Sequence, residues 1–339
     1  MSQLQTILLY ILLIVAGIIA VNAIVHFVWR ARSVFRLRKS KRPPTGNPVL
    51  WRDPGEIENL DLFHGPGGED GIPAAPFRFI KEHSAGSSPS LSVRDARGRA
   101  WRVKWGDEVN TENFCTRFAW ACGYFVETTY FLREGKIEGV HGKLKRAQKC
   151  LDEQYNFSNA RFELDDQSVT KYFEEDGWAW NDNPFIGTRE LNGLKVLFLL
   201  FSNWDNKDKR DVARGSNTAI FQHKNEVRYL IIDWGGAMGK WGTNLVSRGK
   251  WDCTGYQSQN DSFLKLGPDG SLNWGYLGQR TEDVSAGIRP EDVRWFYQYA
   301  GRINDNQIRR ALVASGASDE EADCFTHAMR ERLDKLKQV

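Results

Sequence analysis

The sequence predicts an α+β fold made of two lobes, preceded by one transmembrane helix. Three observations lead to this prediction: short extended runs around a single amphipathic helix, helical patterns toward the C-terminus, and a long uncharged apolar run near the N-terminus. With 339 residues, of which 41% are hydrophobic, the chain can fill one large domain or two modest ones. The expected segments are 1–29 for the anchor, 30–76 for a basic juxtamembrane segment and Pro/Gly-rich linker, 77–142 for the small lobe, and 143–339 for the large, mostly helical lobe.

The apolar run at residues 6–28 contains no Asp, Glu, Lys or Arg and spans roughly 35 Å as a helix, enough to cross a bilayer. A cleaved signal peptide is the alternative, but it normally has a basic start and a shorter apolar core. Residues 30–42 contain seven Lys or Arg and no acid. By the positive-inside rule we expect the N-terminus outside and the soluble domain in the cytoplasm. The predicted partner is therefore the lipid bilayer, with the basic segment also attracted to anionic headgroups.

The net charge and the cysteines bear on nucleic-acid binding, zinc binding and the redox state of the compartment. The net charge of +3 is small and gives no indication of a nucleic-acid partner. The cysteines are odd in number, widely spread and without a C-x-x-C pair, so we expect reduced thiols in a reducing compartment and no zinc site. The five are Cys115, Cys122, Cys150, Cys253 and Cys324.

Extended runs with close turns predict the small lobe. The first three runs form an antiparallel meander. An amphipathic helix follows, with Phe114 and Phe118 on one face, and two more strands come after it. This is the order of a small antiparallel sheet with one helix. The predicted strands cover residues 77–82, 91–95, 100–106, 126–132 and 136–140.

The rest of the chain predicts the large lobe. Residues 191–204 are apolar enough for a buried helix, and 217–222 and 227–233 read as a hairpin. Residues 243–290 are expected to form loops and short helices. Three helices end the chain, with Asn304 or Asp305 and Ser318 as plausible N-caps.

Charged residues with a possible chemical purpose begin at the end of the third predicted strand. Lys104 ends that strand, and Glu108 and Glu112 lie in the first turns of the following helix. A lysine on a rigid strand can hold phosphates when a helix carboxylate orients its ammonium group. The turn between the first two strands can offer backbone N–H groups to phosphate. Its candidate residues are Gly86, Ser87 and Ser88.

The second half of the pattern follows the buried helix. Asp205 and Lys207 come directly after it, and Asp233 ends the hairpin before two glycines. An aspartate in a polar loop can accept the proton of an attacking hydroxyl, and a nearby lysine can neutralise a moving phosphoryl group. A second aspartate at a strand end can bind Mg²⁺, which prefers carboxylate oxygens. Each residue alone has an ordinary structural explanation, so the order in the chain is what favours a site.

These motifs resemble those of the protein-kinase-like superfamily. "WRVKWG" is similar to the VAIK-type strand, "NWDNK" to the H-R-D-L-K-x-x-N catalytic loop, and "IIDWGG" to the D-F-G element. The pattern is atypical and resembles HipA-type kinases and the secretory-pathway casein kinases. It also resembles a group of bacterial membrane-anchored proteins with a "FHGPGG" lead-in and a "W-x-V-K-x-G" strand. The resemblance implies a bilobal kinase-like fold, ATP and Mg²⁺ as cofactors, and phosphoryl transfer to an unknown protein, lipid or small-molecule hydroxyl.

The resemblance also implies a role for each residue. Lys104 would be the phosphate lysine, with Glu112 as its helix partner and Glu108 as the competitor for that role. Asp205 would be the catalytic aspartate, and Lys207 would neutralise the phosphoryl group. Asp233 would be the principal metal ligand. One departure is that Arg210 stands where the superfamily has a metal-binding asparagine. Asp211 could substitute as a metal ligand, with Asp208 as a weaker candidate. Two alternatives therefore stay open: a catalytically inactive pseudokinase scaffold, and an unrelated domain in which these residues do not converge.

Overall fold

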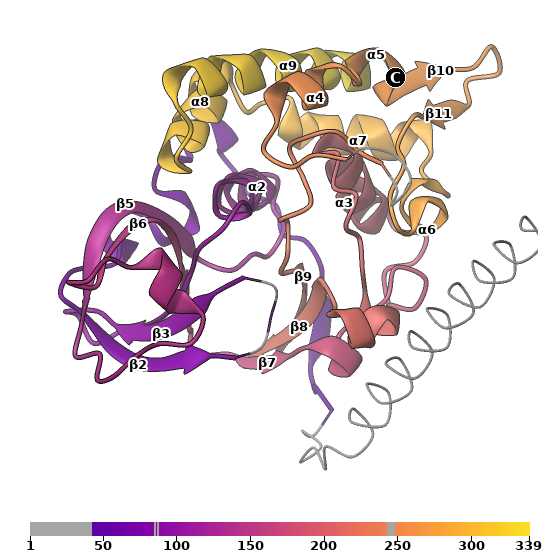
Figure 1. Cartoon of the computed structure of the whole chain (residues 1–339). Helices are drawn as coiled ribbons and strands as arrows, with labels where there is room; N and C mark the ends of the chain where they lie inside the picture. The colour runs from indigo at the N-terminus through magenta and orange to yellow at the C-terminus, as the bar shows by residue number, and fades with distance from the viewer. Residues whose placement is uncertain (1–42, 85, 87, 243–247) are drawn as a thin grey trace, which may run out of the picture.

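The chain folds into two lobes (Figure 1). The computed structural model describes residues 43–339 except for 85, 87 and 243–247. A β-barrel lies at the lower left of Figure 1 and the C-terminal helices lie along the top. The barrel interior and the large lobe have separate hydrophobic cores, which confirms the predicted α+β class. The predicted membrane span at 6–28 lies outside the described residues, among which no helix is long and apolar enough to cross a bilayer.

The small lobe is a closed barrel with the strand order β2-β3-β4-β6-β5. Its strands are β2 (Phe77–His83), β3 (Ser90–Arg94), β4 (Ala100–Lys104), β5 (Thr129–Glu138) and β6 (Asn156–Leu164). Neighbouring strands are antiparallel except β2 and β5, which run parallel and close the barrel. The antiparallel meander is therefore confirmed, whereas the parallel closure and β6, which lies past the expected boundary at residue 142, were not predicted.

Side-chain alternation explains the barrel interior. Leu91 and Val93 on β3, and Trp101 and Val103 on β4, are at most 1% exposed, while the residues between them point outward. The two strands predicted after the helix are wrong as separate elements. They are one strand, β5, because pairing with β6 continues through its polar middle.

The helix α2 (Val109–Ala121) joins the two lobes. Its predicted aromatic face packs against the large lobe, while the helix also contacts β5 and β6 of the barrel. The ring centroids of Phe114 and Phe118 lie 6.2 and 5.6 Å from that of Phe201. The Asn110 side chain also donates to Ser315 O at 2.9 Å. The first turn of α2 is therefore held at a fixed place between the lobes.

The large lobe contains a sheet as well as helices. Its order is β1-β9-β8-β7, and the lead-in strand β1 pairs in parallel with β9. The predicted hairpin is confirmed as β8 and β9. The strands are β1 (Asn47–Val49), β7 (Thr170–Tyr172), β8 (Thr218–His223), β9 (Glu226–Ile231) and a separate pair, β10 (Leu264–Leu266) and β11 (Leu272–Trp274).

The helices of the large lobe surround α3 (Arg189–Leu200), whose residues from Leu191 to Leu200 are all buried. The predicted N-caps are confirmed, since Asn304 and Ser318 accept hydrogen bonds from Gln307 N and Glu321 N. The other α-helices are α4 (Cys253–Gln257), α5 (Asn260–Phe263), α6 (Thr281–Ser285), α7 (Pro290–Ala300), α8 (Asp305–Ala314) and α9 (Asp319–Lys337). The short 3-10 helices are η1 (Ile57–Asn59), η2 (Gly65–Gly67), η3 (Glu69–Gly71), η4 (Ala147–Cys150), η5 (Glu174–Asp176) and η6 (Lys209–Arg214).

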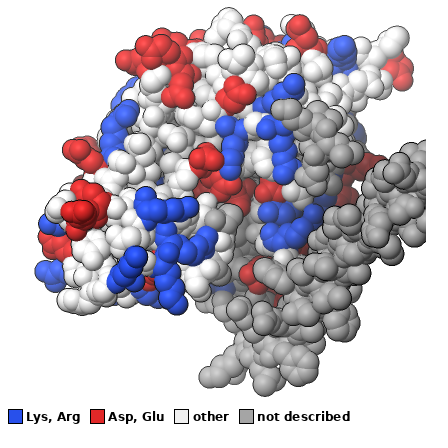
Figure 2. Space-filling view, in the orientation of Figure 1, with Lys and Arg blue, Asp and Glu red and all other residues white. Residues whose placement is uncertain are grey.

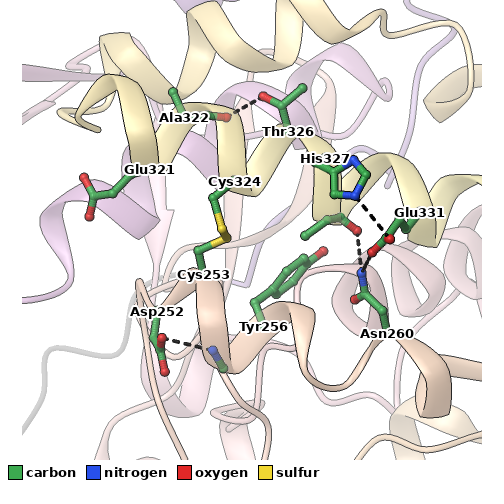
Figure 3. The surroundings of a disulfide bond; sticks show 12 residues. Asp252, Cys253, Tyr256, Asn260, Glu321, Ala322, Cys324, Thr326, His327 and Glu331 are labelled. Carbon is green, nitrogen blue, oxygen red and sulfur yellow. Dashed lines mark hydrogen bonds and ion pairs between the residues drawn. A yellow bond between two sulfur atoms is a disulfide. The ribbon is translucent and has the colours of Figure 1, made fainter.

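A disulfide between Cys253 and Cys324 joins α4 to α9 (Figure 3). The expectation that all five cysteines are reduced is therefore wrong for this pair. The reason is that the fold brings together two residues separated by 71 positions, which sequence spacing alone does not reveal. The remaining three, Cys115, Cys122 and Cys150, are free thiols.

Candidate active site between the lobes

Lys104 lies at the end of β4, on the face of the barrel that turns toward α2. Its ammonium is 3.9 Å from a carboxylate oxygen of Glu112, so the predicted pair is present but long. Arg161 stands opposite Lys104 in the β4–β6 register and forms ion pairs with both Glu112 and Glu163. Arg161, which is only 2% exposed, lies closer to the Glu112 carboxylate than Lys104 does. Sequence reasoning missed it because no strand was expected there.

Burial and neighbouring charges shift the ionisation of this group. Burial and Arg161 lower the pKa of Lys104, and Glu163 and Asp233 oppose that shift. Burial alone would raise the pKa of Glu163, but Arg161 and Lys104 lower it to about 2. The carboxylate therefore stays ionised, pairs with Arg161 and attracts the charge of Lys104. The face of the barrel that turns toward α2 is suited to bind an anionic ligand.

Three carboxylates meet where α2 begins and β9 ends. Ligand oxygens of Glu108, Glu112 and Asp233 all lie within 4.8 Å of one another. Gly235 permits this approach, because a Cβ there would lie 2.7 Å from the carboxyl carbon of Glu108. Lys250, from the loop that follows the glycines, pairs with Glu108 at 3.0 Å. Hard carboxylate oxygens at this spacing fit a divalent cation such as Mg²⁺ or Mn²⁺.

Asp205 and Lys207 face the same region from the large lobe. Their side chains form an ion pair of 3.1 Å. The glycine loop lies against them, since a Cβ at Gly236 would come 2.6 Å from the Cβ of Asp205. Burial raises the pKa of Asp205, Lys207 opposes this effect and Asp233 adds to it. A carboxylate with a raised pKa is a better proton acceptor than an exposed aspartate.

The structure brings together Lys104, Glu112, Asp205, Lys207 and Asp233, but it places Asp211 elsewhere. Asp211 was predicted as a metal ligand, but its carboxylate pairs instead with Arg280 and Arg214, each at 2.6 Å. Asp208 is fully buried and pairs with Arg210. Neither aspartate belongs to the three-carboxylate group, and both hold η6 in place.

The turn between β2 and β3 lies beside the end of β4. Trp105 N donates to Pro89 O at 3.3 Å, which keeps the turn next to the strand that carries Lys104. The carbonyl oxygen of Gly86 accepts a hydrogen bond of 2.9 Å from Arg146. A Cβ at Gly106 would lie 3.5 Å from Ser88 Oγ. Ser87, the third residue predicted for this turn, lies outside the described residues.

A cavity of about 670 Å³ lies on the outer face of the barrel, lined by residues of β2, β3, β4 and the end of β6. Arg102, two residues before Lys104 on β4, lines it together with Lys81 and Arg94, and Lys171 and Phe173 line it from the large lobe. Figure 2 shows Lys and Arg side chains gathered over β2 and β3 in the same orientation as Figure 1. Glu163, Asp165 and Asp166 also line the cavity, so its wall carries charges of both signs.

The solved structures that are similar to this chain include two of the Golgi casein kinase. One is described as a crystal structure of the Golgi casein kinase (11% identity, TM-score 0.38, covering 83% of this chain and 74% of that chain). The other is the Golgi casein kinase with Mn/ADP bound (9% identity, TM-score 0.37, covering 83% and 75%). No family model matches the sequence, and a search of curated proteins finds no match. At these levels of similarity, neither structure assigns a role to any residue of this chain.

Proposed function

We propose that this chain is an ATP- and divalent-metal-dependent phosphotransferase that moves the γ-phosphoryl group to a hydroxyl acceptor. The observation that carries the proposal is the meeting of one strand lysine, three clustered carboxylates and a Lys-paired aspartate between the lobes. These groups come from β4, α2, the loop after α3 and the end of β9. A structural domain without a ligand has no need to concentrate four carboxylates and two lysines from four separate segments.

Each residue has a stated task in this proposal, and Glu112 has two. Lys104 holds the phosphates, and Glu112, which is itself held by Arg161, orients Lys104. Asp205 accepts the proton of the acceptor hydroxyl, and Lys207 offsets the charge of the moving group. Glu108, Glu112 and Asp233 would hold the cation, which when bound would neutralise the phosphate oxygens.

In the same proposal, residues 6–28 anchor the enzyme in a bilayer and the basic segment at 30–42 faces the cytoplasm. The acceptor is then a hydroxyl that comes near a membrane surface. The anchor would raise the local concentration of any acceptor held at that surface.

Titration calorimetry with Mg²⁺–ATP and an assay of phosphate release test the proposal. Asp233→Ala is expected to weaken Mg²⁺–ATP binding by at least tenfold, because it removes one of three metal carboxylates. Asp205→Asn is expected to keep binding and to lower phosphate release about 10²-fold or more. Asp334→Asn, at an exposed position on α9, is the matched control and should change neither. A folded wild-type protein that does not bind Mg²⁺–ATP at millimolar concentration would refute the proposal.

The second candidate function is a catalytically inactive scaffold at the membrane. It is favoured by Arg210 and Asp211, both of which are engaged in structural ion pairs where the superfamily has a second metal ligand. The same two assays separate the candidates. A wild-type protein that binds Mg²⁺–ATP but releases no phosphate, with Asp205→Asn indistinguishable from it, would favour the scaffold.

A further inference from the structure

The segment Tyr276–Arg280 is bound closely to the loop that carries Asp205, although about seventy residues separate them in the sequence. The phenol of Tyr276 donates to Asn203 O at 2.5 Å. Gln279 N donates to Trp204 O at 3.1 Å, and Arg280 N donates to Asn206 Oδ1 at 2.9 Å. Contacts therefore run along the whole loop, and they fix the backbone of Gln279 beside Asp205.

The side chain of Gln279 uses this placement to reach the Asp205 carboxylate. Its Nε2 donates to Asp205 Oδ1 at 2.6 Å, while Lys207 Nζ lies 3.1 Å from Oδ2. Each carboxylate oxygen thus has a polar partner, and a hydrogen bond from the Asn217 side chain also lowers the pKa of Asp205. Gly278 permits the close approach, since a Cβ there would lie 2.1 Å from the Tyr276 hydroxyl oxygen and 3.1 Å from Trp204 O.

From these contacts we infer that Gln279 is a positioning residue for proton transfer to Asp205. The inference rests on the proposed function. In the reaction, the acceptor O–H proton passes to the Asp205 carboxylate. The acceptor oxygen bonds to the γ-phosphorus as the bond to the β,γ-bridging oxygen breaks, and ADP leaves. An amide cannot take the proton, so Gln279 acts by fixing the carboxylate plane and by favouring its ionised form.

Other charged groups also act on the pKa of Asp205, the quantity that Gln279 is expected to lower. Lys207 on its own loop and Asp233 on the glycine loop act on the carboxylate in opposite directions. Burial and the charge of Asp205 raise the pKa of Tyr276, so its phenol stays protonated as a donor to Asn203 O. Because burial already raises the pKa of Asp205, loss of a neutral donor should raise it further.

The experiment is the pH dependence of Mg²⁺–ATP hydrolysis, in which water serves as the acceptor. Gln279→Leu is expected to move the acid limb of kcat upward by about one pH unit and to lower kcat about tenfold. The KM for ATP should stay unchanged, because Gln279 lies on the acceptor side. Gln279→Glu should move the limb further, because it places a second carboxylate against the first. Gln257→Leu, at an exposed position on α4, is the control and should leave the profile unchanged.

Two outcomes would overturn the inference. Faster hydrolysis by Gln279→Leu, with no shift of the acid limb, would mean that the side chain blocks the acceptor site. An unchanged profile in a folded variant would mean that the contact has no role in proton transfer.

A second measurement separates failure of this inference from failure of the proposed function. Carbon-13 NMR of the aspartate carboxyls, with the Asp205 signal assigned by its loss in Asp205→Asn, reports the pKa without any activity. An upward shift in Gln279→Leu in a protein that hydrolyses no ATP would refute the phosphotransferase alone. No shift in an active enzyme would refute the positioning role alone.

Discussion

The two sides of the candidate site are held in place by different forces. On the barrel side, Arg161 is buried between Glu112 and Glu163, and all three side chains are charged. On the large-lobe side, Asp205 is held by one lysine and by the neutral amide of Gln279. Buried charges are costly when a partner is lost, whereas neutral donors are exchanged at small cost. We therefore expect the phosphate side to be part of the fold, and the proton-transfer side to tolerate substitution without unfolding the protein.

The largest expected effect comes from breaking the barrel side. Arg161→Leu would leave Glu112 and Glu163 buried against each other without the cation between them. We expect the free energy of unfolding to fall by about 3–5 kcal/mol, the usual cost of removing one partner of a buried pair. Urea unfolding followed by circular dichroism measures this loss.

The matched control for Arg161→Leu is an exposed arginine with two carboxylate partners. Arg309 pairs with Asp319 and Asp323 at 2.7 and 2.6 Å on the surface of the C-terminal helices. Arg309→Leu should cost less than about 1 kcal/mol, because water screens these pairs. Equal losses in the two variants would contradict the contrast between a buried and an exposed network.

The disulfide gives the large lobe a covalent link for which the described part of the barrel has no counterpart. We expect Cys253→Ser with Cys324→Ser to lower the free energy of unfolding by about 2–4 kcal/mol, since the link constrains a long loop in the unfolded chain. Urea unfolding with and without reductant measures the same quantity in the wild-type chain. Cys150→Ser, at a free thiol, should show no dependence on reductant.

The same cysteines test the proposed location. A cytoplasmic domain is expected to keep both thiols reduced, whereas a paired state is typical of oxidising compartments. Alkylation of intact cells before lysis, followed by mass spectrometry, reads the state of Cys253 and Cys324 directly. Paired cysteines in cells would place the soluble domain on the opposite side of the membrane from the one proposed.

Local sequence patterns predicted much of the fold. Short extended runs bounded by close turns predicted β3 and β4, and their inward apolar residues are nearly fully buried. The polar middle of β5 hid its continuity, because only pairing with β6 maintains the strand there. The parallel contact of β2 with β5 joins residues about sixty positions apart, and no local pattern reports such a pairing.

The residues of the candidate site also divide into those that local sequence predicts and those that only distant contacts place there. Lys104, Asp205 and Asp233 were predicted because each follows an apolar element that delivers it to the space between the lobes. Arg161 and Gln279 were missed because strand register and a distant segment place them there. Asp211 was misassigned because its partner Arg280 lies 69 residues away, so the ion pair leaves no trace in the local sequence.

The smallest expected effect comes from Asp205→Asn, which removes the proposed proton acceptor and should stabilise the fold. Burial raises the pKa of Asp205, so the ionised carboxylate is less favourable in the folded protein than in the unfolded chain. That cost is fully present above the folded-state pKa and disappears below the unfolded value of about 3.9. Asp205→Asn should therefore raise the free energy of unfolding at pH 7 by about 0.5–2 kcal/mol, a range typical of stabilising substitutions.

The pH dependence of this stabilisation shows whether burial of the ionised Asp205 carboxylate is its cause. Urea unfolding of the wild type and of Asp205→Asn between pH 3 and pH 8 should show two curves that converge as the pH falls, with Asp334→Asn following the wild type throughout. If Asp205→Asn is instead less stable at pH 7, the contacts of the carboxylate with Lys207 and Gln279 outweigh its burial. In that case Asp205 would belong to the fold as firmly as Arg161 does, and the two sides of the site would be held alike.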